Sequence, residues 1–181
     1  MALKSINRFF YILLSLAVLQ PMILIPEIPY KEVVFVLIAL VISFWHGVEW
    51  MGWKRMMTFF AIVLVISWCY ETLSVKTGFP FGDYYYTDKL GAKIGLIPVN
   101  IMPVYFAVGY FSYVLSNILF SKRYVSYPGW SSLLVALGAS FLMVSWDLTM
   151  DPMMATVHGN WIWAHGGPYL GVPLSNFADI I

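Results

Sequence analysis

The chain has 181 residues, of which 61% are hydrophobic and only 10% are charged, whereas a soluble domain is about 45–50% apolar and about 25% charged. Its 10 Lys and Arg against 9 Asp and Glu give a net charge of +1 without a basic cluster, which excludes a nucleic-acid-binding protein. The single cysteine, Cys69, excludes disulfides, thiolate-clustered zinc and iron–sulfur centres. We therefore expect one integral membrane domain over residues 1–181, embedded in the lipid bilayer.

Five apolar segments predict the fold class, an all-α, polytopic helical membrane bundle with about five transmembrane helices. In chain order they run over Phe9 to Ile25, Val33 to Trp50, Met56 to Leu73, Asn100 to Phe120, and Trp130 to Asp147. Lys4 and Arg8 precede the first segment, but no small-x-small cleavage site follows it, so we interpret it as a retained helix and not as a signal peptide. Pro103 is compatible with the fourth helix because proline is tolerated in a first turn.

Basic residues beside the helices predict the orientation of the chain. With the N-terminus inside, the inner segments carry Lys4, Arg8, Lys54, Arg55, Lys122 and Arg123, and the outer segments carry Lys31, Lys76, Lys89 and Lys93. This bias predicts a multi-pass protein of the cell membrane with a cytoplasmic N-terminus. Two polar-aromatic segments, residues 71–86 and 147–177, then follow outward-running helices, so we expect both on the outer face.

Two carboxyl groups are predicted to lie at membrane depth. The apolar run from Met56 to Tyr70 is only about 22 Å long, shorter than the ~30 Å hydrocarbon core, so the third helix must continue through Glu71 to span. Asp147 likewise ends an apolar run that starts at Trp130. Acids at such depth are usually functional or paired, and a low dielectric favours the protonated form that a general acid needs. The alternative is a solvated acid at each helix end.

Asp151 allows a structural and a chemical interpretation. It precedes Pro152, which disfavours helix at Asp151 and suits an N-cap role for a short following helix. Asp147 and Asp151 also form a DxxxD pair that could hold Mg²⁺ for a diphosphate substrate. No second acid-rich motif and no basic phosphate cradle accompany this pair, so magnesium binding is not favoured.

The histidines do not predict a metal site. His46 and Glu49 share one helical face, but a metal site needs three or four ligands. An interhelical hydrogen bond or an interfacial anchor is therefore the favoured interpretation of this pair. His158 and His165 lie in a glycine-rich segment without helical spacing, and we interpret them as loop residues.

Aromatic residues gather in both polar-aromatic segments. Tyr84, Tyr85 and Tyr86 belong either to an interfacial belt or to the wall of a site. Trp161 and Trp163 lie in a segment too polar and glycine-rich to span, and such a segment at membrane depth must be buried in protein. Aromatic faces near a carboxylic acid would also stabilise a developing carbocation. We therefore expect glycine turns to fold this segment over the helix ends, with both indoles facing inward.

Several sequence blocks occur in a distinctive order from the second helix onward. They are HG at residues 46–47, Glu71 with TGFPFGDYYYTDKLG (77–91), IPVNIMPVYF (97–106), WDLTMDPMM (146–154), GNWIW (159–163) and GPYLGVPLSNF (167–177). These blocks resemble the membrane-embedded carotenoid biosynthesis proteins typified by carotenoid 1,2-hydratase and bisanhydrobacterioruberin hydratase. Members of that family continue after the SNF motif with a Gly-Trp pair and further helices. This sequence stops at Ile181, so we expect a truncated version of the family pattern.

The resemblance implies a cofactor-independent hydro-lyase that adds water to the terminal C1=C2 bond of an acyclic C40 or C50 carotenoid. Protonation of C2 gives a tertiary cation at C1, which water captures as a tertiary alcohol, without a metal. The candidate catalytic acids are Glu71, Asp83, Asp147 and Asp151, and the candidate substrate-binding residues are Tyr84, Tyr86, Trp161, Trp163 and Asn176. We hypothesise that Glu71 and Asp147 share the centre, one donating the proton and the other positioning water.

Two other function classes stay open at this point. The chain could be a non-catalytic, carotenoid-binding partner of another carotenoid biosynthesis enzyme, which would keep the aromatic residues and tolerate loss of the carboxylates. It could also be a small transporter, which predicts acids spread through the depth of the bundle and internal repeat symmetry. The sequence shows neither of these transporter features.

Overall fold

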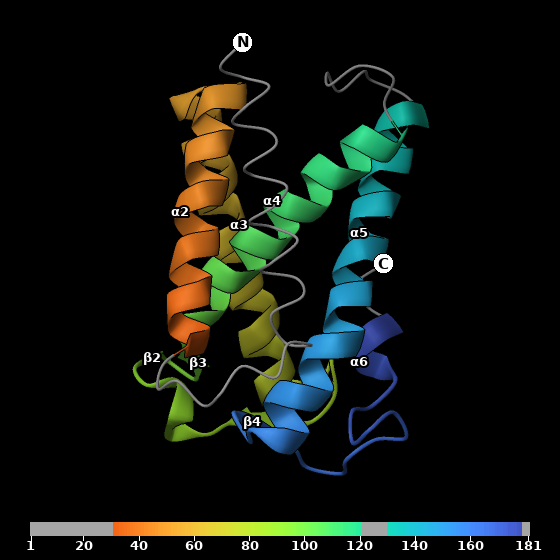
Figure 1. Ribbon diagram of the computed structural model, residues 1–181. Coiled ribbons are helices and arrows are strands. Elements are labelled where there is room, and N and C mark those ends of the chain that lie inside the picture. The colour runs from red at the N-terminus through yellow and green to blue at the C-terminus, as the bar shows by residue number, and fades with distance from the viewer. Residues whose placement is uncertain (1–30, 121–129, 179–181) are drawn as a thin grey trace.

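The computed structural model describes residues 31–120 and 130–178, in which four long helices form a bundle with short strands at one end (Figure 1). The helices are α2 (Lys31–Met51), α3 (Trp53–Thr77), α4 (Ile101–Phe120) and α5 (Trp130–Asp151). They confirm the predicted second to fifth helices to within a few residues. The predicted first helix, Phe9 to Ile25, lies outside the described residues, as do Lys122 and Arg123.

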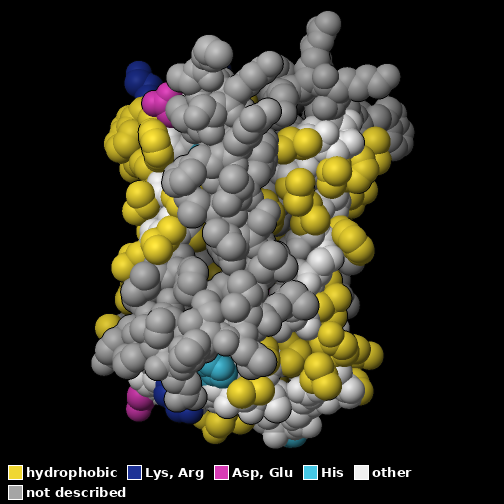
Figure 2. All heavy atoms as spheres, viewed as in Figure 1, with side chains coloured by type: hydrophobic (Ala, Val, Ile, Leu, Met, Phe, Trp, Pro, Cys, Tyr) yellow, Lys and Arg dark blue, Asp and Glu magenta, His cyan; other side chains and the backbone are white. Residues whose placement is uncertain are grey.

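Three of the described helices are long and apolar enough to cross a membrane. They are Trp53–Thr77, Ile101–Phe120 and the continuous helix Ser132–Val157, while Val36–Met51 is a shorter apolar helix. Large apolar side chains such as Val65, Leu119 and Phe141 are exposed on these helices. In the described part of the face in Figure 2, hydrophobic side chains line the flanks and charged side chains lie at the two ends. The fold is therefore that of a helical membrane protein.

α3 passes Glu71 and ends at Gly78, which confirms that this helix continues through the carboxyl group. Gly78 adopts φ 74°, and its N–H donates to the Ser74 carbonyl, so it is a left-handed C-cap. Ser74 also holds the following turn, because its hydroxyl accepts from the Phe81 N–H at 3.1 Å. The chain therefore reverses directly after Glu71 and returns toward it.

α5 continues past Pro152, so the expectation that Pro152 would disfavour helix at Asp151 is wrong. Asp151 has φ −62° and ψ −44°, and the chain proceeds into a π-helix, η3 (Pro152–Val157). Pro152 has no N–H for the Leu148 carbonyl one turn earlier, but the Tyr169 hydroxyl donates to that oxygen at 3.1 Å. A distant residue thus replaces the missing donor, and Asp147 and Asp151 remain one helical turn apart.

The two polar-aromatic segments meet at one end of the bundle, as predicted. β1 (Tyr84–Tyr86) pairs antiparallel with β4 (Trp161–Trp163), with Tyr84 opposite Trp163 and Tyr86 opposite Trp161. The remaining short elements are η2 (Asp88–Leu90), the β2–β3 pair (Lys93–Ile94 with Ile97–Pro98) and α6 (Ser175–Ala178). The start of α3, which carries Lys54, lies at the opposite end (Figure 1).

Two groups of buried residues form the core. The polar-end cluster joins the strands to the helix ends and comprises Phe81, Tyr84, Tyr86, Ile97, Met102, Val144, Ala155, Trp163, Val172 and Phe177. The far-end cluster lies between the helices and comprises Met56, Phe106, Tyr110 and Val114. Every predicted substrate-binding residue belongs to the polar-end cluster, packs against it or, in the case of Asn176, precedes one of its members.

Candidate functional site

A cavity of about 320 Å³ lies at the polar end. Helices α3, α4 and α5, the β1–β4 pair and the C-terminal segment all contribute to its lining. The polar lining residues are Glu71, Tyr84, Tyr86, Lys89, Asn100, Tyr105, Asp147, Asp151, His158, Asn160 and Asn176. The apolar lining residues include Ile101, Val104, Val108, Met143, Met150 and Met154. The cavity therefore combines an apolar region between α4 and α5 with a group of carboxyls and hydroxyls.

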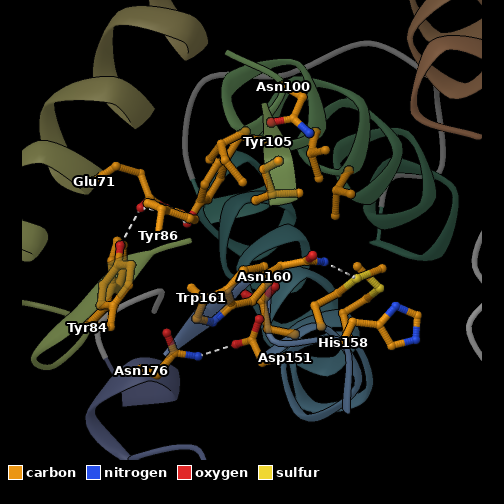
Figure 3. A pocket seen from close by; sticks show the side chains of 18 of the residues that line it. Glu71, Tyr84, Tyr86, Asn100, Tyr105, Asp151, His158, Asn160, Trp161 and Asn176 are labelled. Atoms are coloured by element: carbon orange, nitrogen blue, oxygen red, sulfur yellow. Dashed lines mark hydrogen bonds between the residues drawn. The ribbon is translucent and has the colours of Figure 1, made fainter. Parts of the chain in front are cut away.

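Glu71 is only 3% exposed and accepts hydrogen bonds from three tyrosines, with which it forms the Glu71 cluster (Figure 3). The Tyr84 hydroxyl donates to Oε2. The Tyr86 hydroxyl donates to the same oxygen at 2.8 Å, and the Tyr105 hydroxyl donates to Oε1 at 2.8 Å. Burial, and then the charge of Glu71, raise the pKa of Tyr84 and Tyr86 above its ordinary value. These hydroxyls therefore stay protonated and act as donors.

The alternation of β1 directs two of its three tyrosines inward. Tyr84 and Tyr86 are buried, whereas Tyr85 between them is 53% exposed. On β4, the Trp163 ring lies 4.7 Å from that of Tyr84, and the Trp161 ring lies 6.0 Å from that of Tyr86. Both indoles line the cavity, which confirms the prediction that they face inward. The paired strands thus form an aromatic wall beside Glu71.

α5 brings two more carboxyl groups to the cavity, Asp147 and Asp151. The Asn176 side-chain amide donates to Asp151 Oδ2, and both residues are buried (Figure 3). Asp147 has no hydrogen bond to another residue within 31–120 and 130–178, but it interacts electrostatically with Asp151 and Glu71. The structure therefore places the three predicted acids Glu71, Asp147 and Asp151 around one cavity, with Asn176 beside one of them.

Asp83 is separated from the other three acids. Its side chain is 60% exposed and lies 3.7 Å from His165 Nε2, and it does not line the cavity. Although it follows directly on the turn that returns to Glu71, it precedes β1 and points to the surface. We therefore do not retain Asp83 among the catalytic candidates.

The remaining histidines have different positions. His158 lies in the turn after η3 and lines the cavity, which its loop position in the sequence did not predict. His46 Nδ1 lies 2.6 Å from the Tyr110 hydroxyl and joins α2 to α4, whereas Glu49 is exposed. This confirms the interhelical hydrogen bond. Within the described residues, no group of three or more His, Cys, Asp or Glu is placed to hold a metal ion.

Besides His158, sequence reasoning missed four polar residues of the lining, Lys89, Asn100, Tyr105 and Asn160. Asn100 directly precedes the apolar helix α4 and Tyr105 lies in its second turn, so polar side chains at the start of an apolar helix were the available signal. Asn100 Oδ1 and Trp163 Nε1 are buried without a hydrogen-bond partner among the described residues. Because buried polar atoms normally have partners, this acceptor and this donor can bind a water molecule or a hydroxyl group in the cavity.

Residues 31–179 match the model of the protein family described as carotenoid biosynthesis protein. The match includes every element that builds the cavity, from α2 to α6. Comparisons with curated proteins and with solved structures gave no match.

Proposed function

Because the chain belongs to the carotenoid biosynthesis protein family, we propose that it is a hydro-lyase that hydrates the terminal C1=C2 bond of an acyclic carotenoid. The substrate is a C40 or C50 polyene, and the product is a tertiary alcohol. One observation supports this proposal above the others, namely three carboxyl groups, of which Glu71 and Asp151 are buried and Asp147 is half-buried, and an aromatic wall around a single cavity. Hydration of an alkene requires a proton donor and, beside it, aromatic rings that stabilise the cation.

The reaction needs a proton, a water molecule and stabilisation of a cation. A carboxyl group protonates C2, so that the tertiary cation forms at C1. Water then attacks C1 and loses one of its protons to a carboxylate. The faces of Tyr84, Tyr86, Trp161 and Trp163 supply quadrupoles that favour a positive charge, and Asn176 and Asn100 supply polar atoms near the acids.

The apolar part of the cavity suits the hydrocarbon of the substrate. Val104 and Val108 on α4 and Met143 and Met150 on α5 line it, and side chains of this type bind by apolar contact without directional requirements. A carotenoid dissolves in the bilayer, so we infer a multi-pass protein of the cell membrane with a cytoplasmic N-terminus and the cavity toward the outer face. Other carotenoid biosynthesis enzymes would then supply the substrate within the same membrane.

The carboxyl groups favour an enzyme over a carotenoid-binding partner. Burial of an acid in a low-dielectric site is costly, and a protein that only binds a hydrocarbon gains nothing from three of them. A transporter is disfavoured because the three acids line one cavity at the polar end instead of being spread through the depth of the described bundle.

The test is expression of the full chain in a host that accumulates acyclic carotenoids, followed by mass analysis of the extracted pigments. We expect products heavier than the substrate by one water, or by two where both ends react. Co-purification of unchanged carotenoid with the protein, without any hydrated product, would support the binding partner and contradict the enzyme.

A further inference from the structure

We propose that the three carboxyl groups of the cavity have different roles in hydration. Asp147 donates the proton to C2, Asp151 receives the proton that water loses, and Glu71 remains a fixed negative charge near the cation. Tyr105 is the positioning residue that holds Glu71 in this state from α4. The inference rests on the proposed hydratase function and assigns the roles that the sequence left open.

The hydrogen bonds of Glu71 indicate its role. An ionised carboxylate only accepts hydrogen bonds, and three hydroxyls donate to Glu71 from β1 and α4. Hydrogen bonds from donors favour the charged form of a carboxyl group and offset the cost of burying it. Both oxygens already have partners, so Glu71 is poorly placed to transfer a proton to an alkene. A fixed carboxylate instead stabilises the positive charge that develops in the transition state.

Asp147 has the opposite surroundings. No hydrogen bond ties it to another residue in the described chain, and it lines the cavity together with two other acids, Asp151 and Glu71, with which it interacts electrostatically. Neighbouring negative charges favour the neutral, protonated form of a carboxyl group. The proton of Asp147 is therefore held by no acceptor within the described residues and is available to the substrate.

Asp151 is oriented by Asn176, whose amide donates to Oδ2 and leaves Oδ1 for another partner (Figure 3). Asp151 also lies one helical turn after Asp147 on α5. Asp151 is therefore placed to accept a proton from water and to pass it over a short path to Asp147.

The steps balance without any oxidant or reductant. The O–H bond of Asp147 breaks as the π electrons form the C2–H bond, which leaves the cation at C1. The water oxygen forms the C1–O bond, and one water O–H bond breaks as its proton moves to Asp151. Transfer of that proton from Asp151 to Asp147 restores the starting state. The sum is alkene plus water giving the alcohol.

Deuterium exchange distinguishes the proposed roles of Asp147 and Asp151. Membranes that contain the full chain are incubated in D₂O with an acyclic C40 carotenoid and with an acyclic C50 carotenoid, and the pigments are analysed by mass spectrometry. Asp147→Asn should give neither hydration nor deuterium uptake, because no cation forms. Asp151→Asn should lose hydration but still incorporate deuterium. The cation forms when Asp147 adds a deuteron to C2, and it then loses a protium from C2 or an adjacent methyl group to the Asp147 carboxylate, which exchanges with D₂O before the next cycle.

The outcomes distinguish the roles from the function itself. Asp88→Asn is the matched control, because Asp88 is a fully exposed acid, and it should match the wild type. Deuterium uptake in Asp147→Asn but not in Asp151→Asn, or normal hydration in both, would overturn the assignment while the hydratase stands. A wild type that adds no water overturns the hydratase and this inference with it. If either Asn variant fails to accumulate in the membrane, the corresponding Asp→Ser variant is tested by the same criteria.

Tyr105→Phe tests the positioning role. It removes one hydroxyl and keeps the ring, so kcat should fall about tenfold with little change in KM. The matched control is Tyr85→Phe on the exposed side of β1. An unchanged kcat in Tyr105→Phe, or a rise in KM as large as the fall in kcat, would overturn the positioning role.

Discussion

Two buried ionisable side chains meet tyrosine hydroxyls in this protein, with different surroundings. Glu71 at the polar end is 3% exposed and contacts three hydroxyls, and His46 toward the far end is 8% exposed and lies 2.6 Å from the Tyr110 hydroxyl. The His46 ring packs against the rings of Trp50 and Tyr110 at centroid distances of 6.3 and 5.9 Å. Glu71 instead lines a cavity of about 320 Å³ whose lining does not include His46.

Burial and hydrogen bonding, which His46 and Glu71 share, therefore do not by themselves identify a functional acid or base. On the His46 side, rings pack against the far-end cluster and fill the space; for example, the centroids of Phe106 in the cluster and Phe60 packed against it lie 4.8 Å apart. A polar group in such packing joins helices and cannot reach a substrate. At Glu71 the same kind of contact borders free volume and two further carboxyl groups, so there the polar contacts can act on a ligand.

The largest expected effect is the loss of activity in Glu71→Gln. The substitution keeps the shape but removes the carboxylate, so hydration should fall by about 10²–10⁴-fold, in the range seen when one charged catalytic group is lost. The measurement is the rate of hydrated carotenoid formation per amount of membrane protein. His46→Gln is the counterpart at the far end and should retain activity within about threefold while it unfolds at a lower temperature. Equal losses of rate in the two variants would contradict the assignment of a catalytic role to Glu71 and a structural role to His46.

Gly167→Ala should destabilise the polar end. A Cβ at this position would lie 2.1 Å from the backbone of Val172 and Pro173, so the turn that places Asn176 beside Asp151 must shift. We expect a loss of about 3 kcal/mol, at the upper end for overpacking, because backbone atoms cannot move aside as a side chain would. Thermal unfolding in detergent measures this loss.

The control for Gly167→Ala is Gly109→Ala on α4, where the added Cβ would meet the Met143 side chain at an ordinary 3.7 Å. This variant should unfold within a few degrees of the wild type. A Gly167→Ala protein as stable as Gly109→Ala would show that the C-terminal turn does not support the site.

The sequence predicted the features that depend on long patterns. Apolar runs located the helices, and the shortness of the run before Glu71 correctly carried α3 past this residue. The two polar-aromatic segments were expected at one end, and the β1–β4 pairing confirms it. Period-two alternation also explains why Tyr84 and Tyr86 reach the site while Tyr85 does not.

Features that depend on one distant contact were not predictable. Pro152 should have ended α5 by local rules, but the Tyr169 hydroxyl satisfies the carbonyl that proline leaves without a donor. Tyr105 lies in an apolar helix, where a tyrosine ordinarily indicates an interfacial belt, and only the packing of α4 against α3 brings it to Glu71. Asp83 is close in sequence to the tyrosines of the site, yet its place before β1 directs it to the surface.

A smaller effect is expected from Tyr110→Phe, which removes the hydroxyl beside His46. The ring should keep its place, because it stacks on Phe106 with a centroid distance of 6.2 Å and an interplanar angle of 17°. Loss of the contact should lower the free energy of unfolding by about 1–2 kcal/mol and leave the rate of hydration nearly unchanged. Thermal unfolding and product formation are measured on the same membranes. A loss of activity as large as that of Tyr105→Phe would contradict the structural role of the His46 contact.

The smallest expected effect belongs to Tyr169→Phe. Its hydroxyl donates to the Leu148 carbonyl at 3.1 Å, while its ring packs edge-on against Phe177 at 5.4 Å and should remain in place. Removing a single hydrogen bond to a half-buried carbonyl should lower the free energy of unfolding by about 1 kcal/mol. Leu148 lies between Asp147 and Asp151 in sequence, so a small loosening of α5 here should reduce hydration by about twofold to threefold, less than the loss in Tyr105→Phe. Tyr85→Phe, which removes an exposed hydroxyl, is the control for both measurements. A stability loss in Tyr169→Phe that equals or exceeds that of Tyr110→Phe would show that the continuation of α5 past Pro152 depends on this one hydroxyl far more than its geometry indicates.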